Sequence, residues 1–161
     1  MNITEEIIAS TKELFSSYVS LGATPGTPCS HMDNDNNESI IGTIDFSGDV
    51  NGHLSIRFPV STAVLVACAF LYLETDDLQD EDIKDALGEL ANILAGQVKA
   101  SIDPQGSKVQ LSLPKVLTNH ECTCGECTCG EQTQIPFYLD EGEFTVEVKF
   151  NPPAKENAPL N

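Results

Sequence analysis

The sequence has few basic residues: 8 Lys and Arg stand against 25 Asp and Glu, and the formal net charge is -17. The phosphates of nucleic acids and of anionic lipids repel such an acidic surface. The composition therefore argues against nucleic-acid and membrane partners, and it favours a partner that presents a basic surface.

Long apolar runs are also missing. The longest one, Val64 to Leu73, is much shorter than the roughly 20 residues that a membrane-spanning helix needs. The first ten residues contain two glutamates and neither the basic nor the apolar region of a secretory signal. With 161 residues, the chain is expected to form one cytoplasmic domain.

Apolar periodicity predicts a layered α+β domain over residues 1–150, with helices packed on a largely antiparallel sheet. Residues 22–38 are rich in Gly, Pro, Ser, Asn and Asp and are expected to form a mobile loop. Residues 151–161 form a polar tail after Phe150. The predicted helices cover residues 3–21, 62–73 and about 81–102, and the predicted strands cover residues 39–46, 50–58, 108–113, 134–139 and 144–150.

The longest predicted helix, residues 81–102, has one apolar face and one polar face. At helical spacing, one side collects Ile83, Leu87, Leu90, Leu94 and Val98. The opposite side carries a polar stripe formed by Asp85, Glu89, Asn92, Gly96 and Lys99. A solvated helix surface would have this composition too, but Gly88, Asn92 and Gly96 disfavour a helix interior by up to about 1 kcal/mol each. Their presence indicates a docking surface, because glycine lets a partner approach and the Asn amide both donates and accepts hydrogen bonds.

The segment 85–96, DALGELANILAG, is followed by the strand and turn VQLSLPKV at 109–116 and by the last alternating strand. Together these features resemble the CheC/CheX/FliY family of chemotaxis phosphatases. The shared signature is Glu-x-x-Asn on a long helix, with Gly four residues further on and then a strand that ends in a proline turn. The chain carries one such motif, as CheX does, and the resemblance extends from about residue 40 to residue 150.

The resemblance implies a CheC-like fold, a homodimer, and a phosphorylated CheY-type response regulator as partner. It implies that Asn92 orients the attacking water and that Glu89 contacts a lysine of the regulator, with Asp85, Gly96 and Lys99 extending the docking surface. The phosphatase needs no cofactor of its own, because the regulator holds Mg²⁺. It also needs no protein nucleophile, and the sequence indeed lacks a Gly-x-Ser-x-Gly elbow, a phosphate-cradling Gly-Lys loop and a catalytic cysteine signature.

Two other functions are compatible with the same residues. The chain could be a binding module that keeps the CheX-like fold and docks the regulator without catalysis. It could also be a metal or redox sensor, because residues 118–133 form an insertion with a tandem Glu-Cys-Thr-Cys-Gly repeat. The four repeated cysteines beside His120 are Cys122, Cys124, Cys127 and Cys129.

Thiolates at this density bind Zn²⁺ or another soft ion, or alternate between thiol and disulfide. Their spacing is tighter than that of common structural zinc sites, so an exposed loop of reduced thiols remains an equal alternative. His31 and His53 have no clustered partners in the sequence and are expected at the surface.

Overall fold

The computed structural model describes residues 2–29, 38–118 and 131–151, and it confirms the predicted α+β class. The helices are α1 (Ile3–Leu14), which continues as a π-helical segment (Phe15–Val19), α2 (Val60–Leu71) and α3 (Asp80–Ile102); a 3-10 turn, η2 (Thr75–Asp77), precedes α3. The strands are β1 (Thr24–Pro25), β2 (Ser39–Gly48), β3 (Asn51–Pro59), β4 (Val109–Leu111), β5 (Lys115–Thr118), β6 (Glu131–Leu139) and β7 (Gly142–Asn151).

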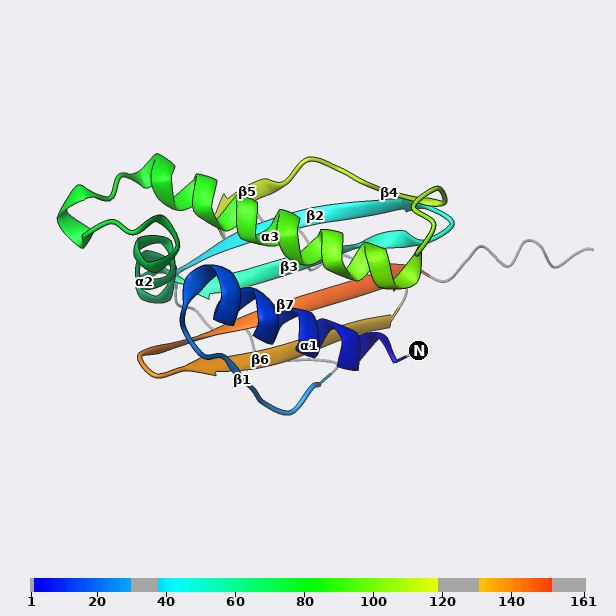
Figure 1. The fold of residues 1–161 in the computed structure, drawn as a ribbon, viewed down its shortest axis with the longest axis horizontal. Helices are drawn as coiled ribbons and strands as arrows, with labels where there is room; N and C mark the ends of the chain where they lie inside the picture. Colours follow the sequence, from blue (N-terminus) through cyan, green and yellow to red (C-terminus); the bar gives the residue numbers. More distant parts are fainter. Residues whose placement is uncertain (1, 30–37, 119–130, 152–161) are drawn as a thin grey trace, which may run out of the picture.

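The strands form one sheet in the order β1-β6-β7-β3-β2-β4, and all of its pairs are antiparallel. The fifth strand, β5, also pairs with β2, beside residues 40–43, whereas β4 pairs with β2 at residues 46–48. Figure 1 shows α1 and α3 crossing the same face of the sheet, with α2 at one end of this helical layer.

The core lies between the helices and the sheet. Around Phe144 of β7, the ring of Phe15 stacks at a centroid distance of 4.5 Å, and the rings of Phe58 and Phe137 lie at 5.2 Å. Alternate side chains of β3 and β7 face this core because successive strand residues point to opposite sides of the sheet. The arrangement anchors the π-helical continuation of α1 on β3, β6 and β7.

A glycine sets the distance between α3 and the sheet. A Cβ atom at Gly42 of β2 would lie 2.9 Å from the carbonyl oxygen of Leu87 and 3.3 Å from the Cβ of Ala91. Such contacts are too close, so a larger residue would push α3 away from β2. Gly42 therefore helps to place the helix that carries the polar stripe.

Several predicted boundaries differ from the structure. The expected loop at 22–38 begins with β1, which pairs with β6, and Cys29 forms a further bridge to Gln134. A two-residue strand has no periodicity that a sequence could reveal. The strand predicted at 108–113 ends at Leu111, and β5 follows after the turn at Pro114.

The boundaries of the insertion and of the tail also shift. Thr118 belongs to β5, and β6 begins at Glu131, so both strands extend into the expected insertion at 118–133. The last strand, β7, includes Asn151, the first residue of the expected tail. The rest of these two segments lies outside the described residues.

Candidate functional site

The site is built on α3, which is held along one whole side. The side chains of Leu87, Leu90, Leu94 and Val98 are all 0% exposed, as the apolar periodicity predicted. At the start of the helix, the Asp82 carboxylate accepts a hydrogen bond of 2.9 Å from the backbone N–H of Gln79, which satisfies a free helix-end donor. The buried side thus fixes the direction in which the opposite side points.

The predicted polar stripe occupies that opposite side. Asp85, Glu89 and Asn92 are exposed, and Gly96 is partly exposed. In the part of the chain that the structure describes, the side chains of Glu89 and Asn92 make no hydrogen bond or ion pair. Their full hydrogen-bonding capacity is therefore available for a partner.

The two glycines of α3 have different environments. A Cβ at Gly88 would lie 3.4 Å from Cγ2 of Val116 and 3.8 Å from the ring of Pro114, so Gly88 faces the turn that leads into β5. A Cβ at Gly96 would meet no atom within 4 Å. Packing inside the chain accounts for Gly88, but it gives no reason for Gly96, which keeps the helix surface low beside Asn92.

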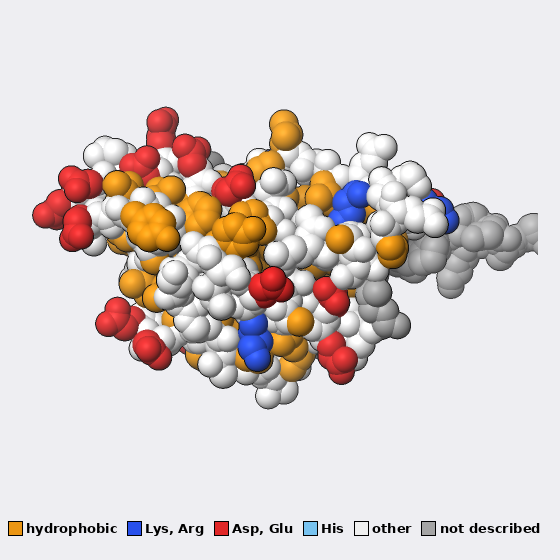
Figure 2. Space-filling model, viewed as in Figure 1, with side chains coloured by type: hydrophobic (Ala, Val, Ile, Leu, Met, Phe, Trp, Pro, Cys, Tyr) orange, Lys and Arg blue, Asp and Glu red, His pale blue; other side chains and the backbone are white. Residues whose placement is uncertain are grey.

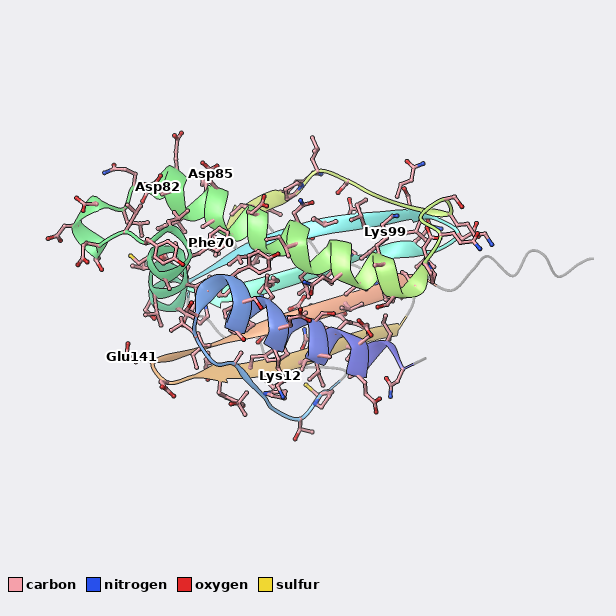
Figure 3. The ribbon with its side chains drawn as sticks, viewed as in Figure 1. Lys12, Phe70, Asp82, Asp85, Lys99 and Glu141 are labelled. Atoms are coloured by element: carbon pink, nitrogen blue, oxygen red, sulfur yellow. The ribbon has the colours of Figure 1, made fainter. Side chains whose placement is uncertain are left out.

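Lys99, at the far end of the stripe, has a partner within the chain. Its Nζ atom lies 3.8 Å from the Asp103 carboxylate, one turn further on. Figure 3 shows Lys99 near the last turns of α3, with Asp85 near the first turns. The role of Lys99 in docking stays a prediction, and a partner carboxylate would have to compete with Asp103 for it.

Asp103 joins the end of α3 to β4. Its buried carboxylate accepts hydrogen bonds of 2.9 Å from the backbone N–H groups of Lys108 and Val109. The hydrogen bond from Lys108, supported by that from Val109 and by the Lys99 charge, lowers the pKa of Asp103 although burial opposes the shift. Asp103 therefore closes the loop behind the stripe in its ionised form.

An exposed leucine beside the stripe was missed by the sequence reasoning. Leu113 is 85% exposed and precedes Pro114, which lies next to Gly88 of α3. The sequence placed it at the end of a strand, where alternation alone cannot tell a side chain that faces the core from one that faces solvent. Leu113 adds an apolar contact point next to the polar stripe.

The face of the sheet away from α1 and α3 carries charged and polar residues. There Arg57 lies 3.4 Å from Glu147, which also accepts a hydrogen bond of 3.1 Å from Gln134. His53 was expected at the surface, but it is only partly exposed, and burial lowers its pKa against the opposing effect of Glu147 and Asp45. The sequence could not predict this partial burial, because it results from the position of β3 as a central strand between β2 and β7.

The proposed metal ligands, Cys122, Cys124, Cys127 and Cys129, lie outside the described residues. Within residues 2–29, 38–118 and 131–151, no group of three or more His, Cys, Asp or Glu side chains is arranged to hold a metal ion. Cys29 and Cys68, the two cysteines in these ranges, are free thiols.

Known proteins show to which family this helix and sheet belong. The family model described as chemotaxis phosphatase CheX matches residues 40–138, more than half of the chain. This chain belongs to the CheX family. The match includes all of α3 and therefore the whole polar stripe.

Individual relatives agree with the family. The CheY-P phosphatase CheX of Thermotoga maritima is 24% identical over 119 residues, which cover 74% of this chain and 77% of the relative. A putative chemotaxis protein from Desulfovibrio vulgaris Hildenborough is 30% identical, with a TM-score of 0.73 over 94% of this chain and 97% of the other.

The same fold occurs in a complex of CheX with CheY, BeF3 and Mg²⁺ from Borrelia burgdorferi. That chain is 20% identical, with a TM-score of 0.75 over 93% of this chain and 98% of the other. The predicted layered fold is therefore the fold of CheX and CheC-like proteins. None of the helices in the described ranges has the length and apolar composition to cross a membrane.

Proposed function

We propose that this protein hydrolyses the aspartyl phosphate of a CheY-type response regulator, with Asn92 orienting the attacking water and Glu89 docking on the regulator. The observation that carries the proposal is the state of these two side chains on α3. Both are exposed one turn apart on a helix anchored by its other side, and neither has a hydrogen-bond partner among the described residues. Membership of the CheX family and the activity named for the Thermotoga maritima relative support it.

The chemistry requires little more than correct positioning. An aspartyl phosphate is an acyl phosphate that already hydrolyses slowly, and the regulator supplies Mg²⁺ at the phosphoryl group. The amide of Asn92 can accept one hydrogen bond from a water molecule and donate another towards the phosphoryl oxygens. Holding that water in line with the leaving oxygen lowers the barrier without a covalent intermediate.

Docking has to bring Asn92 within reach of the regulator's active site. The carboxylate of Glu89 lies on the same side of α3, and Asp85 continues the acidic surface one turn earlier. Both carboxylates favour contact with a lysine side chain of the regulator. The open surface at Gly96 leaves room for the regulator backbone beside Asn92.

The test is the decay of a phosphorylated regulator of the CheY type, followed by loss of radiolabel, with the wild-type protein and with three variants. Asn92→Ala should abolish the acceleration while binding, measured by titration calorimetry, persists. Glu89→Ala should weaken binding and acceleration together. Gln105→Ala removes another exposed amide, in the loop after α3 and away from Glu89 and Asn92, and should behave as the wild type.

Full acceleration by Asn92→Ala would refute the assigned mechanism. Binding through the stripe without any acceleration, for every regulator tried, would instead identify a non-catalytic binding module. The homodimer implied by the family resemblance stays a prediction, which sedimentation of the full chain would test. The same holds for the cysteine cluster, which metal analysis and thiol titration of anaerobically purified protein would test.

A further inference from the structure

The second helix, α2, is apolar on all of its sides. Residues 60–73 contain no charged side chain. Its buried residues are Thr62, Ala63, Val66 and Ala67, which all lie on one side. The other side is apolar except for the exposed Ser61, and it keeps part of its surface in water. We call this outward side the α2 face; its members are Val60, Val64, Leu65, Cys68, Leu71 and Tyr72.

Tyr72, at the end of this face, contributes little to the fold. Its side chain is 86% exposed, the highest value among the large apolar residues that the structure describes. Its backbone is left-handed, with φ at 58°, a conformation that is unfavourable for a residue with a Cβ relative to the right-handed one. Glycine is the usual residue at such a helix end. An exposed tyrosine in this place is more suited to contact another molecule than to stabilise its own chain.

The α2 face begins at a groove. A hollow of about 370 Å³ lies beside Val60, between the first turns of α3 and the strands β2 and β5. Its apolar lining comes from Ile40, Val60, Ile83, Val116 and Leu117, and its charged lining consists of two acids and one cation, Glu38, Asp80 and Lys84. From Val60, the face follows α2 through Val64 and Leu71, residues that share one side of a helix. The surface therefore has the length of about three helical turns and a recess at one end for an anchoring side chain.

Acidic residues surround this apolar surface. The segment from Glu74 to Asp82, which follows α2, contains six of them and no cation, and η2 within it lies against Cys68, whose Sγ is 3.9 Å from the Thr75 hydroxyl. The turn between β6 and β7 adds Asp140, Glu141 and Glu143, and the backbone N–H of Glu143 donates to Thr62 of α2. Figure 2 shows hydrophobic side chains gathered at this end of the molecule, with acidic side chains around them.

We propose that the α2 face is a second docking surface, and that its occupant is a cationic amphipathic helix of a protein partner. The apolar side of such a helix would cover the α2 face, and its Lys or Arg side chains would reach the acids of residues 74–82 and 140–143. A second copy of this chain does not fit, because it would place the same acids opposite one another. An anionic membrane is excluded by the same charge argument.

The probe is a synthetic 18-residue helical peptide with Leu on one side and Lys on the other, titrated into the full ¹⁵N-labelled protein. The expected result is saturable binding with amide shift changes concentrated in residues 60–83 and 140–143. Raising the salt from about 0.1 to about 0.5 M should weaken binding at least about threefold, because the shorter Debye length screens the acidic rim. A peptide of the same composition with Leu and Lys shuffled, and one with Glu in place of Lys, should bind at least about tenfold more weakly.

Two matched variants locate the contact. Tyr72→Asn removes the aromatic ring and suits the left-handed backbone, so a fold defect is not expected. This substitution should weaken peptide binding by at least about fivefold, as expected for loss of an aromatic anchor in an interface. Leu113→Asn changes the other strongly exposed apolar residue, which is 85% exposed beside the α3 stripe, and should leave the affinity unchanged.

Neutralising the rim with Asp76→Asn and Asp77→Asn should reduce both the affinity and its salt dependence. Equal binding of the shuffled peptide would show mere charge attraction and would overturn the proposal. Shift changes centred on the α3 stripe would overturn it as well. So would self-association of the protein that occurs without peptide and depends on Tyr72. The latter would make a second copy the occupant of the α2 face.

Discussion

The helices α2 and α3 pack against each other but present opposite kinds of surface to the solvent. α3 has a buried apolar side and an exposed stripe that carries Asp85, Glu89 and Asn92. α2 has a buried apolar side and an outward side that is apolar too. The ends of the helices differ as well: α3 leads to Asp103, which binds the backbone of β4, whereas α2 ends at an exposed tyrosine in a left-handed conformation.

The difference separates two ways in which a helix can serve binding. On α3, the groups that could act on a partner are polar side chains placed by a well-packed helix, so their loss should change function and leave stability alone. On α2, the surface available to a partner is part of the apolar layer itself. Substitutions there should affect stability and association in proportions set by how far each side chain is buried.

The largest expected effect contrasts Leu90 of α3 with Leu65 of α2. Leu90 is 0% exposed, whereas Leu65 is only partly buried. Leu90→Ala should lower the free energy of unfolding by about 2–5 kcal/mol, through lost burial and the cavity left behind. Leu65→Ala should cost at least about 1 kcal/mol less, because its surface already lies partly in water. Urea unfolding followed by circular dichroism would measure both, and equal losses would contradict the comparison.

Gly96 tests whether the α3 stripe contains a residue that lowers the stability of the helix but leaves room for a partner. Because a Cβ at this position meets no atom within 4 Å, Gly96→Ala should raise the free energy of unfolding by up to about 1 kcal/mol through helix propensity. The same methyl group should slow dephosphorylation of the regulator, since it stands beside Asn92 where the partner approaches. Thermal melts and regulator decay, measured on one preparation, would show the two changes in opposite directions. A variant that is more stable and fully active would remove Gly96 from the docking surface.

Tyr72 makes the corresponding test on α2. Tyr72→Gly relieves the left-handed backbone but adds freedom to the unfolded chain, so the net gain in unfolding free energy should be below about 1 kcal/mol. Regulator dephosphorylation should be unchanged, because Tyr72 lies outside the α3 stripe. Thermal melting would measure the change in stability, and regulator decay would measure dephosphorylation. A clear loss of stability would mean that the tyrosine packs against the chain, contrary to its 86% exposure.

The smallest effect concerns the end of α3 and depends on pH. The folded pKa of Asp103 is lowered from its ordinary value of 3.8, mainly by the hydrogen bond from the Lys108 backbone, so its ionised form stabilises the fold above that value. This contribution is lost as the pH falls through the lower, folded pKa. The stability difference between wild type and Asp103→Asn should stay constant from about pH 7 to pH 5 and narrow below about pH 4. Urea unfolding across this range would detect it, and a difference that grows in acid would have the wrong sign.

Much of the site could be predicted because α3 is strongly amphipathic. Its apolar residues recur at helical spacing, and this pattern alone places Glu89 and Asn92 on the side away from the core. Leu113 could not be predicted in the same way, since its exposure depends on the turn at Pro114 and on the distance to α3. Lys99 and Asp103 have the i,i+4 spacing of a helical ion pair, so this contact could have been predicted, whereas the hydrogen bonds from Lys108 and Val109 to Asp103 depend on the loop that follows α3.

The sequence by itself determined the elements whose periodicity is local: α3 with its two sides, the β2–β3 hairpin, and the alternation of β7. It also determined the acidic surface, since charge is a property of composition. Tertiary structure alone decided which strand pairs with which, how Gly42 brings α3 onto β2, and which side of the uniformly apolar α2 stays in contact with water. The physical reason is that these features depend on contacts between residues far apart in the chain, and a helix that is apolar all round carries no signal for the direction of its neighbours.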